Sequence, residues 1–228
     1  MRILAIDTAL EACAAAVLDT ERGAVIARES IAMARGHAEV LMPLIARVME
    51  ASGGGFDALD RIAVTVGPGS FTGLRVGIAA ARGFALATNK PAIGLTTLAA
   101  FAAPLIAEDD TLPVVAAIDA RHEHVYLQVF GPGGRTLVPP RVASLRDALR
   151  AATTSRGARL VGTGASLLAA AWPTSERPPR SVEQRGAPDI DWIAQLGAAA
   201  PEDAGPPKPL YLKPPDAQPQ EAALIARR

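Results

Sequence analysis

The sequence predicts an α/β fold made of two similar halves, because the chain resembles itself at an offset of 112 residues. Residues 5–7 align with residues 117–119, and each segment belongs to an apolar run that ends in Asp. This is the pattern of a buried strand that delivers a carboxylate to the edge of a sheet. A glycine turn follows later in each half, at residues 66–69 and 161–164, after an apolar strand and before an alanine-rich helix. We therefore expect one sheet in each half.

The elements of the first half follow from its hydrophobic pattern. Short apolar runs bounded by turn residues predict strands, and apolar residues spaced three and four apart predict helices. The expected strands are residues 2–7, 12–19, 23–30, 61–66 and 91–95, and the expected helices are residues 37–52, 73–88 and 96–106.

The second half repeats this order less regularly. Its expected strands are residues 113–119, 123–130, 135–139 and 158–162, and its expected helices are residues 144–151, 165–171 and 189–199. The Pro-rich residues 172–180 and 201–219 predict an irregular surface loop and a tail. Two like halves that each open with a strand hairpin and an Asp describe the duplicated ribonuclease-H-like architecture of the actin, hexokinase and Hsp70 group. The expected domains are residues 1–107 and residues 108–228, the second with the Pro-rich tail.

The composition describes a globular chain of balanced charge. Half of the 228 residues are hydrophobic and only 4% are aromatic, so the core must be built from Ala, Val, Leu and Ile. The net charge is zero, with nine basic and nine acidic residues in residues 1–107 and fourteen of each in residues 108–228. Proteins that grip a phosphate backbone unaided usually have clustered positive charge. Tight binding to nucleic acid by this chain alone is therefore not expected.

Cysteine usage and the N-terminal residues predict a soluble, cytoplasmic protein. Cys13 is the lone cysteine, so no disulfide forms within the chain and a reducing compartment is expected. Asp7 and Glu11 interrupt the first apolar run, which excludes a secretory signal peptide there. No segment reaches the roughly 18 uninterrupted apolar residues of a membrane span.

The glycine turn at residues 67–73 is the most informative motif of the sequence. Gly67 and Gly69 can adopt positive φ and leave room beside the backbone, and Ser70 and Thr72 are candidate helix caps. Such a turn can hold an anion. It is not a Walker phosphate loop, because the lysine of that motif is missing. The alternative is a tight strand-to-helix turn that binds nothing.

The chain resembles the TsaB (YeaZ) family. The resemblance runs from residue 3 to about residue 217 and is carried by five strings: ILAIDTALEACAAAVLD, HAEVLMPLI, GPGSFTGLRVG, IDARHEHVY and PLYLKPPDA. It implies the same duplicated fold. It also implies a role as the non-catalytic dimerisation subunit of the bacterial machinery that places threonylcarbamoyl on N6 of adenosine 37, in tRNAs reading codons that begin with A. The implied partners are the catalytic paralogue TsaD, the ATPase subunit TsaE, and tRNA only through the complex.

The same resemblance implies that the chain has no active site of its own. TsaD carries a His-x-x-x-His metal pair just after the strand that follows its glycine-turn helix. At that location this chain has Thr97 and Phe101. Because phenylalanine cannot bind a metal, neither a metal site nor the paralogue's chemistry is expected here.

No tightly bound cofactor is expected, because side chains crowd both predicted hairpins where actin-like ATPases have glycine. A weak ATP, ADP or anion site at the partner interface stays open. Its candidate residues lie at the end of the first strand and in the glycine turn. They are Asp7, Thr8, Gly67, Gly69, Ser70, Thr72 and Arg75. We expect Asp7 and Arg75 to lie at the same edge of the first sheet.

Histidines offer two weaker sites. A helical metalloprotease site needs His-Glu-x-x-His, but Leu41 holds the second His position of the helix that begins at His37, so His37 is expected to cap that helix or face solvent. His122 and His124 are predicted on one face of a strand beside Tyr126. That spacing could hold a metal, but no third ligand is evident, and the role of the pair stays open.

Two helices of the first domain are expected to dock onto the catalytic paralogue or onto a second copy of the chain. One carries small residues at every fourth position, and the other carries an apolar face with methionines that partner surfaces favour. The alternative is packing against their own sheet. The candidate interface residues are Val40, Leu41, Met42, Leu44, Met49, Gly73, Gly77, Ala81 and Ala85.

Three functions remain open at this point. The leading hypothesis is a scaffold that binds and orders the catalytic paralogue. The others are a nucleotide-dependent enzyme of the actin-like fold, either a kinase or a transferase, and a homodimeric nucleotide-binding regulator. The sequence leaves open whether the free chain is a monomer or a homodimer, whether nucleotide binds, and which surface meets the ATPase subunit.

Overall fold

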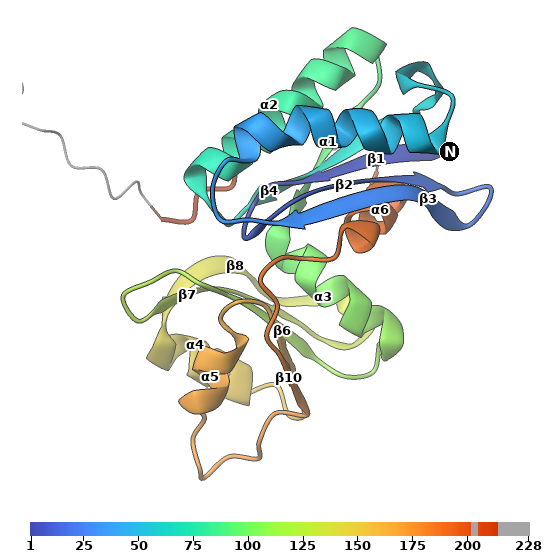
Figure 1. Ribbon diagram of the computed structural model, residues 1–228. Coiled ribbons are helices and arrows are strands. Elements are labelled where there is room, and N and C mark those ends of the chain that lie inside the picture. The colour runs from blue at the N-terminus through green and yellow to red at the C-terminus, as the bar shows by residue number, and fades with distance from the viewer. Residues whose placement is uncertain (202–204, 214–228) are drawn as a thin grey trace, which may run out of the picture.

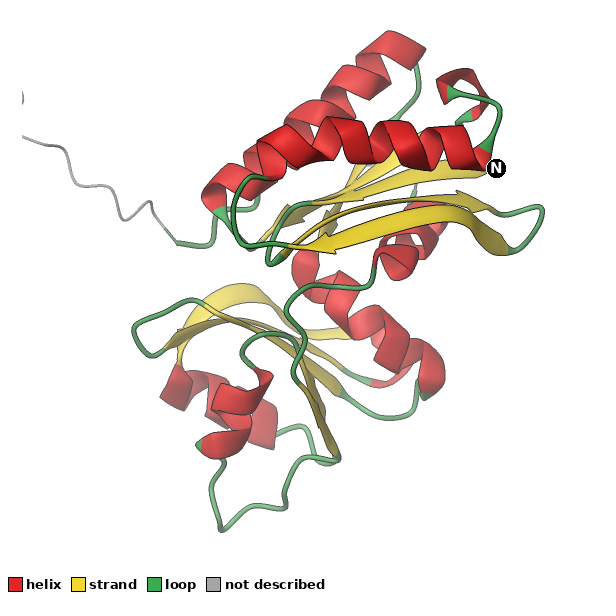
Figure 2. Cartoon of the chain, viewed as in Figure 1, coloured by secondary structure: helices red, strands yellow, loops and turns green. Residues whose placement is uncertain are grey.

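The computed structural model describes residues 1–201 and 205–213. They form two five-stranded sheets with helices on their faces (Figures 1 and 2). The strand order is β3-β2-β1-β4-β5 in the first sheet and β10-β9-β6-β7-β8 in the second. In both sheets an antiparallel meander of three strands continues into parallel strands. The predicted duplicated ribonuclease-H-like fold is confirmed.

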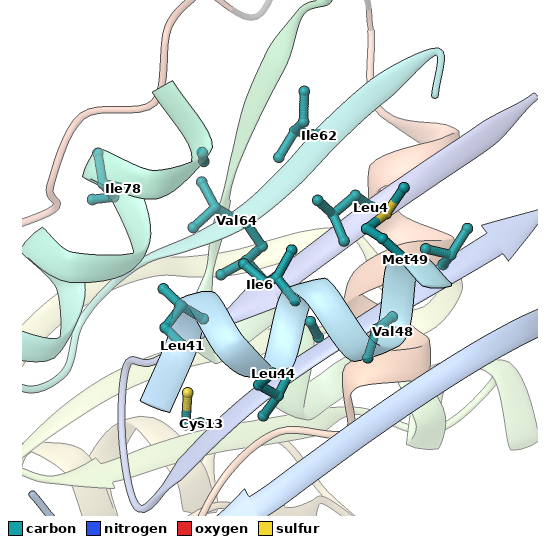
Figure 3. Packing of buried hydrophobic residues seen from close by; sticks show 14 of the residues in the cluster. Leu4, Ile6, Cys13, Leu41, Leu44, Val48, Met49, Ile62, Val64 and Ile78 are labelled. Atoms are coloured by element: carbon teal, nitrogen blue, oxygen red, sulfur yellow. The ribbon is translucent and has the colours of Figure 1, made fainter. Parts of the chain in front are cut away.

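The first sheet is buried on both faces, which explains why its inner strands are apolar throughout. Helices α1 and α2 cover one face, and Figure 3 shows side chains of α1 packed on β1 and β4. The elements of this half are β1 (Arg2–Asp7), β2 (Ala12–Asp19), β3 (Ala24–Ala32), α1 (His37–Ser52), the 3-10 helix η1 (Phe56–Ala58), β4 (Arg61–Gly67), α2 (Phe71–Thr88), β5 (Ala92–Thr96) and α3 (Thr97–Glu108).

The second sheet has shorter strands and its own small core. That core packs α4 and α5 against β6, β7 and β9. The elements are β6 (Val114–Asp119), β7 (His124–Phe130), the 3-10 helix η2 (Pro132–Gly134), β8 (Thr136–Ser144), α4 (Leu145–Thr153), β9 (Arg159–Val161), α5 (Ala165–Ala170), β10 (Ser181–Glu183) and α6 (Ile190–Ala199). Strand β10 was not predicted, because a three-residue strand beside a Pro-rich loop has no periodicity to detect.

The two halves exchange helices across their boundary. Helix α3 follows the first sheet in sequence, yet its Leu98, Phe101 and Leu105 pack on β6 of the second sheet. Helix α6 follows the second sheet, yet its Ile190 and Ile193 pack on the inner face of the first sheet. Both helices lie between the sheets (Figure 1) and contact each other.

The C-terminal segment also returns to the first half. The Leu210 amide donates to the Val66 carbonyl at 2.7 Å, and Arg82 Nε donates to the Pro207 carbonyl at 2.9 Å. The division into residues 1–107 and 108–228 stays a prediction, and α6 with residues 207–210 packs on the first half across that boundary. The reason is physical, because the apolar face of α6 covers strands of the first sheet that would otherwise face water. The part of the predicted tail beyond residue 213 lies outside the described residues.

Equivalent buried arginines hold the ends of the exchanged helices. Arg159 begins β9 and donates from Nη1 to Leu105 O at 2.7 Å and from Nη2 to Asp109 O at 2.5 Å. Arg61 begins β4 and donates to Gly197 O at 2.9 Å and Ala200 O at 2.8 Å. A guanidinium satisfies the unpaired carbonyls of a helix C-terminus and complements its dipole. The same contact therefore occurs once in each half.

None of the helices in residues 1–201 and 205–213 has both the length and the hydropathy needed to cross a membrane.

Replacing Arg159 with Met should lower the free energy of unfolding by about 3 kcal/mol, because the buried carbonyls at the end of α3 lose their charged donor. Chemical denaturation measures this value. The control is Arg156→Met, which changes an exposed arginine three residues away. Equal stability of the two variants would contradict the role assigned to Arg159.

Candidate functional site

Asp7 lies at the carboxyl end of β1, where the first predicted site is centred. Its side chain is fully buried. Oδ1 accepts hydrogen bonds from Thr65 Oγ1 at 2.5 Å and from the Ala9 amide at 3.1 Å, whereas Oδ2 has no partner among the described residues. Burial raises the pKa of this carboxyl above its ordinary value of 3.8. The chain's own hairpin and β4 therefore hold the carboxylate.

The glycine turn lies directly over this hairpin. Ser70 Oγ accepts from the Gly73 amide at 3.3 Å and caps α2, whereas Thr72 is exposed in the first helical turn and is not the N-cap. The Ser70 amide donates to Ala9 O at 2.7 Å, and Thr8 Oγ1 donates to Gly73 O at 2.7 Å. Two hydrogen bonds thus fasten the start of α2 to residues 8–9.

The glycines of the turn and helix are required by this close contact. A Cβ added to Gly69 would lie 2.3 Å from Ala9 O, and one added to Gly73 would lie 2.0 Å from Thr8 O. At Gly77 it would lie 2.4 Å from Thr8 Oγ1. Gly67 has φ 111°, which disfavours any other residue. Packing alone therefore accounts for the glycines, which is the structural alternative that the sequence left open.

The side chains of Arg75 and Asp7 have different partners. Its guanidinium carbon lies 3.6 Å from the centroid of the Phe71 ring, and its Nε donates to Tyr211 Oη at 3.1 Å. Arg75 is exposed on α2, whereas Asp7 is buried beneath the turn. Asp7 and Arg75 therefore do not face each other, because Phe71 and the C-terminal segment hold the arginine on the outer surface. A shared anion site at this edge of the sheet stays a prediction.

The position implied for a metal pair lies in an apolar core. Thr97 and Phe101 are both buried, and Phe101 packs among the side chains of α3 and β6. Leu10, at the tip of the first hairpin, packs against this cluster and also against the core of the first half. In residues 1–201 and 205–213, no group of three His, Cys, Asp or Glu side chains is placed to hold a metal ion.

Two predictions about histidines are corrected. His37 neither caps α1 nor faces solvent, because Gly36 is the N-cap and His37 is buried with Nε2 3.1 Å from Leu10 O. His122 does not lie in a strand. Residues 121–123 have φ of 63°, 50° and 59°, which forms a left-handed turn, and β7 begins only at His124. His122 and His124 therefore do not share a strand face with Tyr126.

Most of the predicted interface residues face the chain's own first sheet, as Figure 3 shows for Leu41, Leu44 and Met49. The buried members are Leu41, Leu44, Met49, Gly73, Gly77 and Ala81. The prediction that these six residues contact a partner is corrected. They pack on the apolar face of the first sheet that α1 and α2 cover, which would otherwise be exposed to water. Val40 and Ala85 are half-buried, and Met42 remains 52% exposed.

The outward side of the same helices carries exposed apolar residues that were not predicted to lie at an interface. Leu86 on α2 is 87% exposed, Phe71 at the start of α2 is 42% exposed, and Tyr211 contacts Phe71 with ring centroids 5.3 Å apart. With Met42 on α1, these form what we term the outer apolar face. Helical periodicity could have identified Leu86 as exposed. Leu86 follows Arg75 by eleven residues and so lies on the same side of α2, opposite the buried Gly73, Gly77 and Ala81.

The chain is similar to proteins of tRNA modification. Residues 26–166 match the family model of TsaD, tRNA N6-adenosine threonylcarbamoyltransferase. The chain is 40% identical over 126 residues to the tRNA threonylcarbamoyladenosine biosynthesis protein TsaB of Escherichia coli (strain K12). This alignment covers 55% of this chain and 53% of that protein. An uncharacterized protein of Mycobacterium tuberculosis is 33% identical over 219 residues, or 95% of this chain and 94% of that protein. The chain thus aligns with about half the length of the TsaB protein.

Solved structures show the same likeness. A crystal structure of an uncharacterized Pseudomonas aeruginosa protein, described as similar to peptidase YEAZ, has a TM-score of 0.77 and 29% identity, covering 93% of this chain and 99% of that chain. YeaZ from Pseudomonas aeruginosa has a TM-score of 0.74 and 29% identity, covering 92% of this chain and 99% of that chain.

Replacing Gly73 with Ala should destabilise the fold by about 3 kcal/mol, because the new methyl group meets the Thr8 carbonyl. Gly83→Ala provides the matched control within the same helix. A Cβ at Gly83 meets nothing within 4 Å, so this change should stabilise the chain by about 0.5–1 kcal/mol. Thermal and chemical denaturation measure both, and a tolerated Gly73→Ala would contradict the close contact.

Replacing Asp7 with Asn should change stability in a pH-dependent way. Because the pKa of Asp7 is raised in the folded chain, its contribution to folding is greatest below pH 3.8 and is lost as pH rises through the folded pKa. The neutral Asn has no such dependence. The free energy of unfolding of the variant, relative to the native chain, should therefore increase from about pH 4 upward. A difference that is constant with pH would contradict this.

Proposed function

The chain belongs to the TsaB (YeaZ) family, and from that premise we propose that it is the non-catalytic scaffold subunit of a tRNA threonylcarbamoyladenosine machinery. In this role it binds the catalytic paralogue TsaD and supports transfer of threonylcarbamoyl to N6 of adenosine 37. The ATPase subunit TsaE and the tRNA meet the chain within that complex. A tightly bound cofactor of its own is not part of the proposal.

The observation that carries the proposal is the burial of Phe101. The resemblance implies that Thr97 and Phe101 stand where the paralogue has its metal pair, and in this chain Phe101 is 1% exposed within an apolar cluster. A phenyl ring cannot ligate a metal, and its burial makes it part of the packing between α3 and the second sheet. The residue that replaces a ligand is thus also a core residue. This supports a chain whose role is to bind rather than to react.

The hairpin of the first half supports the same conclusion. In the actin-like fold a nucleotide lies between the halves, where the first hairpins approach its phosphates. Here the tip residue Leu10 packs into both cores, and residues 8–9 bond to the start of α2. A nucleotide in that position would have to displace these contacts. The match of residues 26–166 to the transferase family model favours the enzyme hypothesis, but the buried Phe101 and the packed hairpin argue against it.

The outer apolar face is the surface that we assign to the partner. Seven large hydrophobic side chains are exposed in the part of the chain that the structure describes. Four of them, Met42, Phe71, Leu86 and Tyr211, lie on α1, α2 or the C-terminal segment beside α2. Aromatic residues, Met and Arg are enriched at the centres of protein interfaces, and Arg75 lies among these side chains.

Mixing the purified chain with TsaD tests the proposal. The expected result is a complex of defined mass, and transferase activity that requires both proteins together with TsaE and tRNA. Light scattering and threonylcarbamoyl incorporation measure the two outcomes. Sustained transfer by this chain in the absence of TsaD would overturn the scaffold role.

Leu86→Glu should weaken binding to TsaD by about a hundredfold or more, because an interface would bury an unpaired carboxylate. Leu86 is 87% exposed, so the variant should fold normally. The matched control is Leu167→Glu on α5, an exposed leucine of the second half. Titration calorimetry compares the two variants, and equal affinity would remove Leu86 from the interface.

A further inference from the structure

The positive charge of the second half is concentrated in one stretch. Residues 141–180 contain seven arginines and only two acidic residues, Asp147 and Glu176, which gives a net charge of +5 in a chain that is neutral as a whole. One of the seven, Arg159, is buried at the end of α3. The other six arginines of this stretch are exposed.

Five of the exposed arginines surround α4. They line three cavities of about 740, 400 and 210 Å³. The largest cavity shares Asp147 and Arg150 with the second, and Thr153 and Glu176 with the third, so the three form one hollowed surface. We term it the α4 arginine surface, and its arginines are Arg141, Arg146, Arg150, Arg156 and Arg177.

Most of these guanidinium groups have no carboxylate partner. Arg150 pairs with Asp147 at 3.9 Å, and Asp147 also accepts from Ser144 Oγ. Among the described residues, none of the remaining four forms an ion pair within 4.0 Å. The largest cavity is lined by the carboxylates of Glu123, Asp147 and Glu176 beside Arg146 and Arg150. The excess of positive charge therefore belongs to the three cavities together, with five arginines against these three carboxylates. The surface thus keeps free planar donors, whose fork geometry matches the oxygens of a phosphate.

The lining favours a polyanion over a protein partner. Protein interfaces depend on buried aromatic or aliphatic anchors at their centre. The exposed large hydrophobic residues of the second half are Leu137, Leu167 and Val182, and none of them lines the three cavities. The large apolar residues that do line the cavities, Leu145, Leu149 and Trp172, are half-buried against the second core. The exposed arginines around them fit a phosphate backbone.

The surface lies at the far end of the molecule from the outer apolar face. Figure 1 shows α4 below the second sheet and α1 and α2 above the first. A partner docked on α1 and α2 therefore leaves the α4 arginine surface open. The second half can then reach a long substrate that the partner holds.

We propose that the α4 arginine surface binds the phosphate backbone of the tRNA within the complex. The inference rests on the proposed function, because it assumes that a tRNA is the substrate presented to the complex. A small number of phosphate contacts from a neutral chain gives weak binding alone and added affinity in the assembly.

The test uses the double variant Arg146→Gln with Arg177→Gln, in complex with TsaD. The probe is an unmodified tRNA transcript, and fluorescence anisotropy measures its binding over a range of salt concentrations. Loss of two phosphate contacts should weaken binding about tenfold at 50 mM salt and make the slope of log K against log salt shallower by about 2. The control is Arg22→Gln with Arg35→Gln, which removes two exposed arginines from the first half and should leave tRNA binding unchanged.

Complex formation is measured first on the same samples. A native chain that forms no complex with TsaD contradicts the proposed function, whatever the RNA result. If the complexes form, equal tRNA binding by the double variant and the native chain overturns the inference. So does an equal loss in the control, which would indicate a general charge effect. A variant that binds tRNA normally but loses a protein subunit would assign the surface to a protein and also overturn it.

Discussion

The exchange of α3 and α6 between the two halves is the constraint on which the rest of the structure depends. Each sheet has an apolar inner face, and each is covered by the helix that follows the other sheet in sequence. Neither half can therefore bury the inner face of its sheet without the other. The buried Arg61 and Arg159 hold the carbonyl ends of these two helices. The space between the sheets therefore holds the packed apolar side chains of α3 and α6.

This packing also supports the proposed role as a binding subunit. Residues that would line a cleft, such as Leu10 and Phe101, become core residues. Phe101 offers no ligand atom, and moving it would cost the hydrophobic contacts of α3. The outward sides of α1 and α2 do not pack in a core. Met42 and Leu86 are exposed there.

Local pattern was enough to predict the helices and every strand except β10, because their apolar periodicity is strong in this chain. It also predicted that Ser70 caps α2 and that the glycine turn could be purely structural. It could not predict which side of α2 faces the sheet, because a helix with small residues on one side and Leu86 on the other is apolar on both. The left-handed turn at residues 121–123 was missed for a different reason. None of its three residues is Gly or Asn, the residue types that usually mark a left-handed conformation.

The return of α6 to the first sheet affects how the chain folds as it is synthesised. Translation delivers β1 to β5 early, but the part of the inner face that α6 covers stays exposed until Ile190 and Ile193 have left the ribosome. Domains that are contiguous in sequence can fold in order from the N-terminus as they emerge. This chain cannot complete its first half before almost the whole polypeptide exists. A nascent chain stalled before residue 190 would expose an apolar sheet face, which is the kind of surface that chaperones bind.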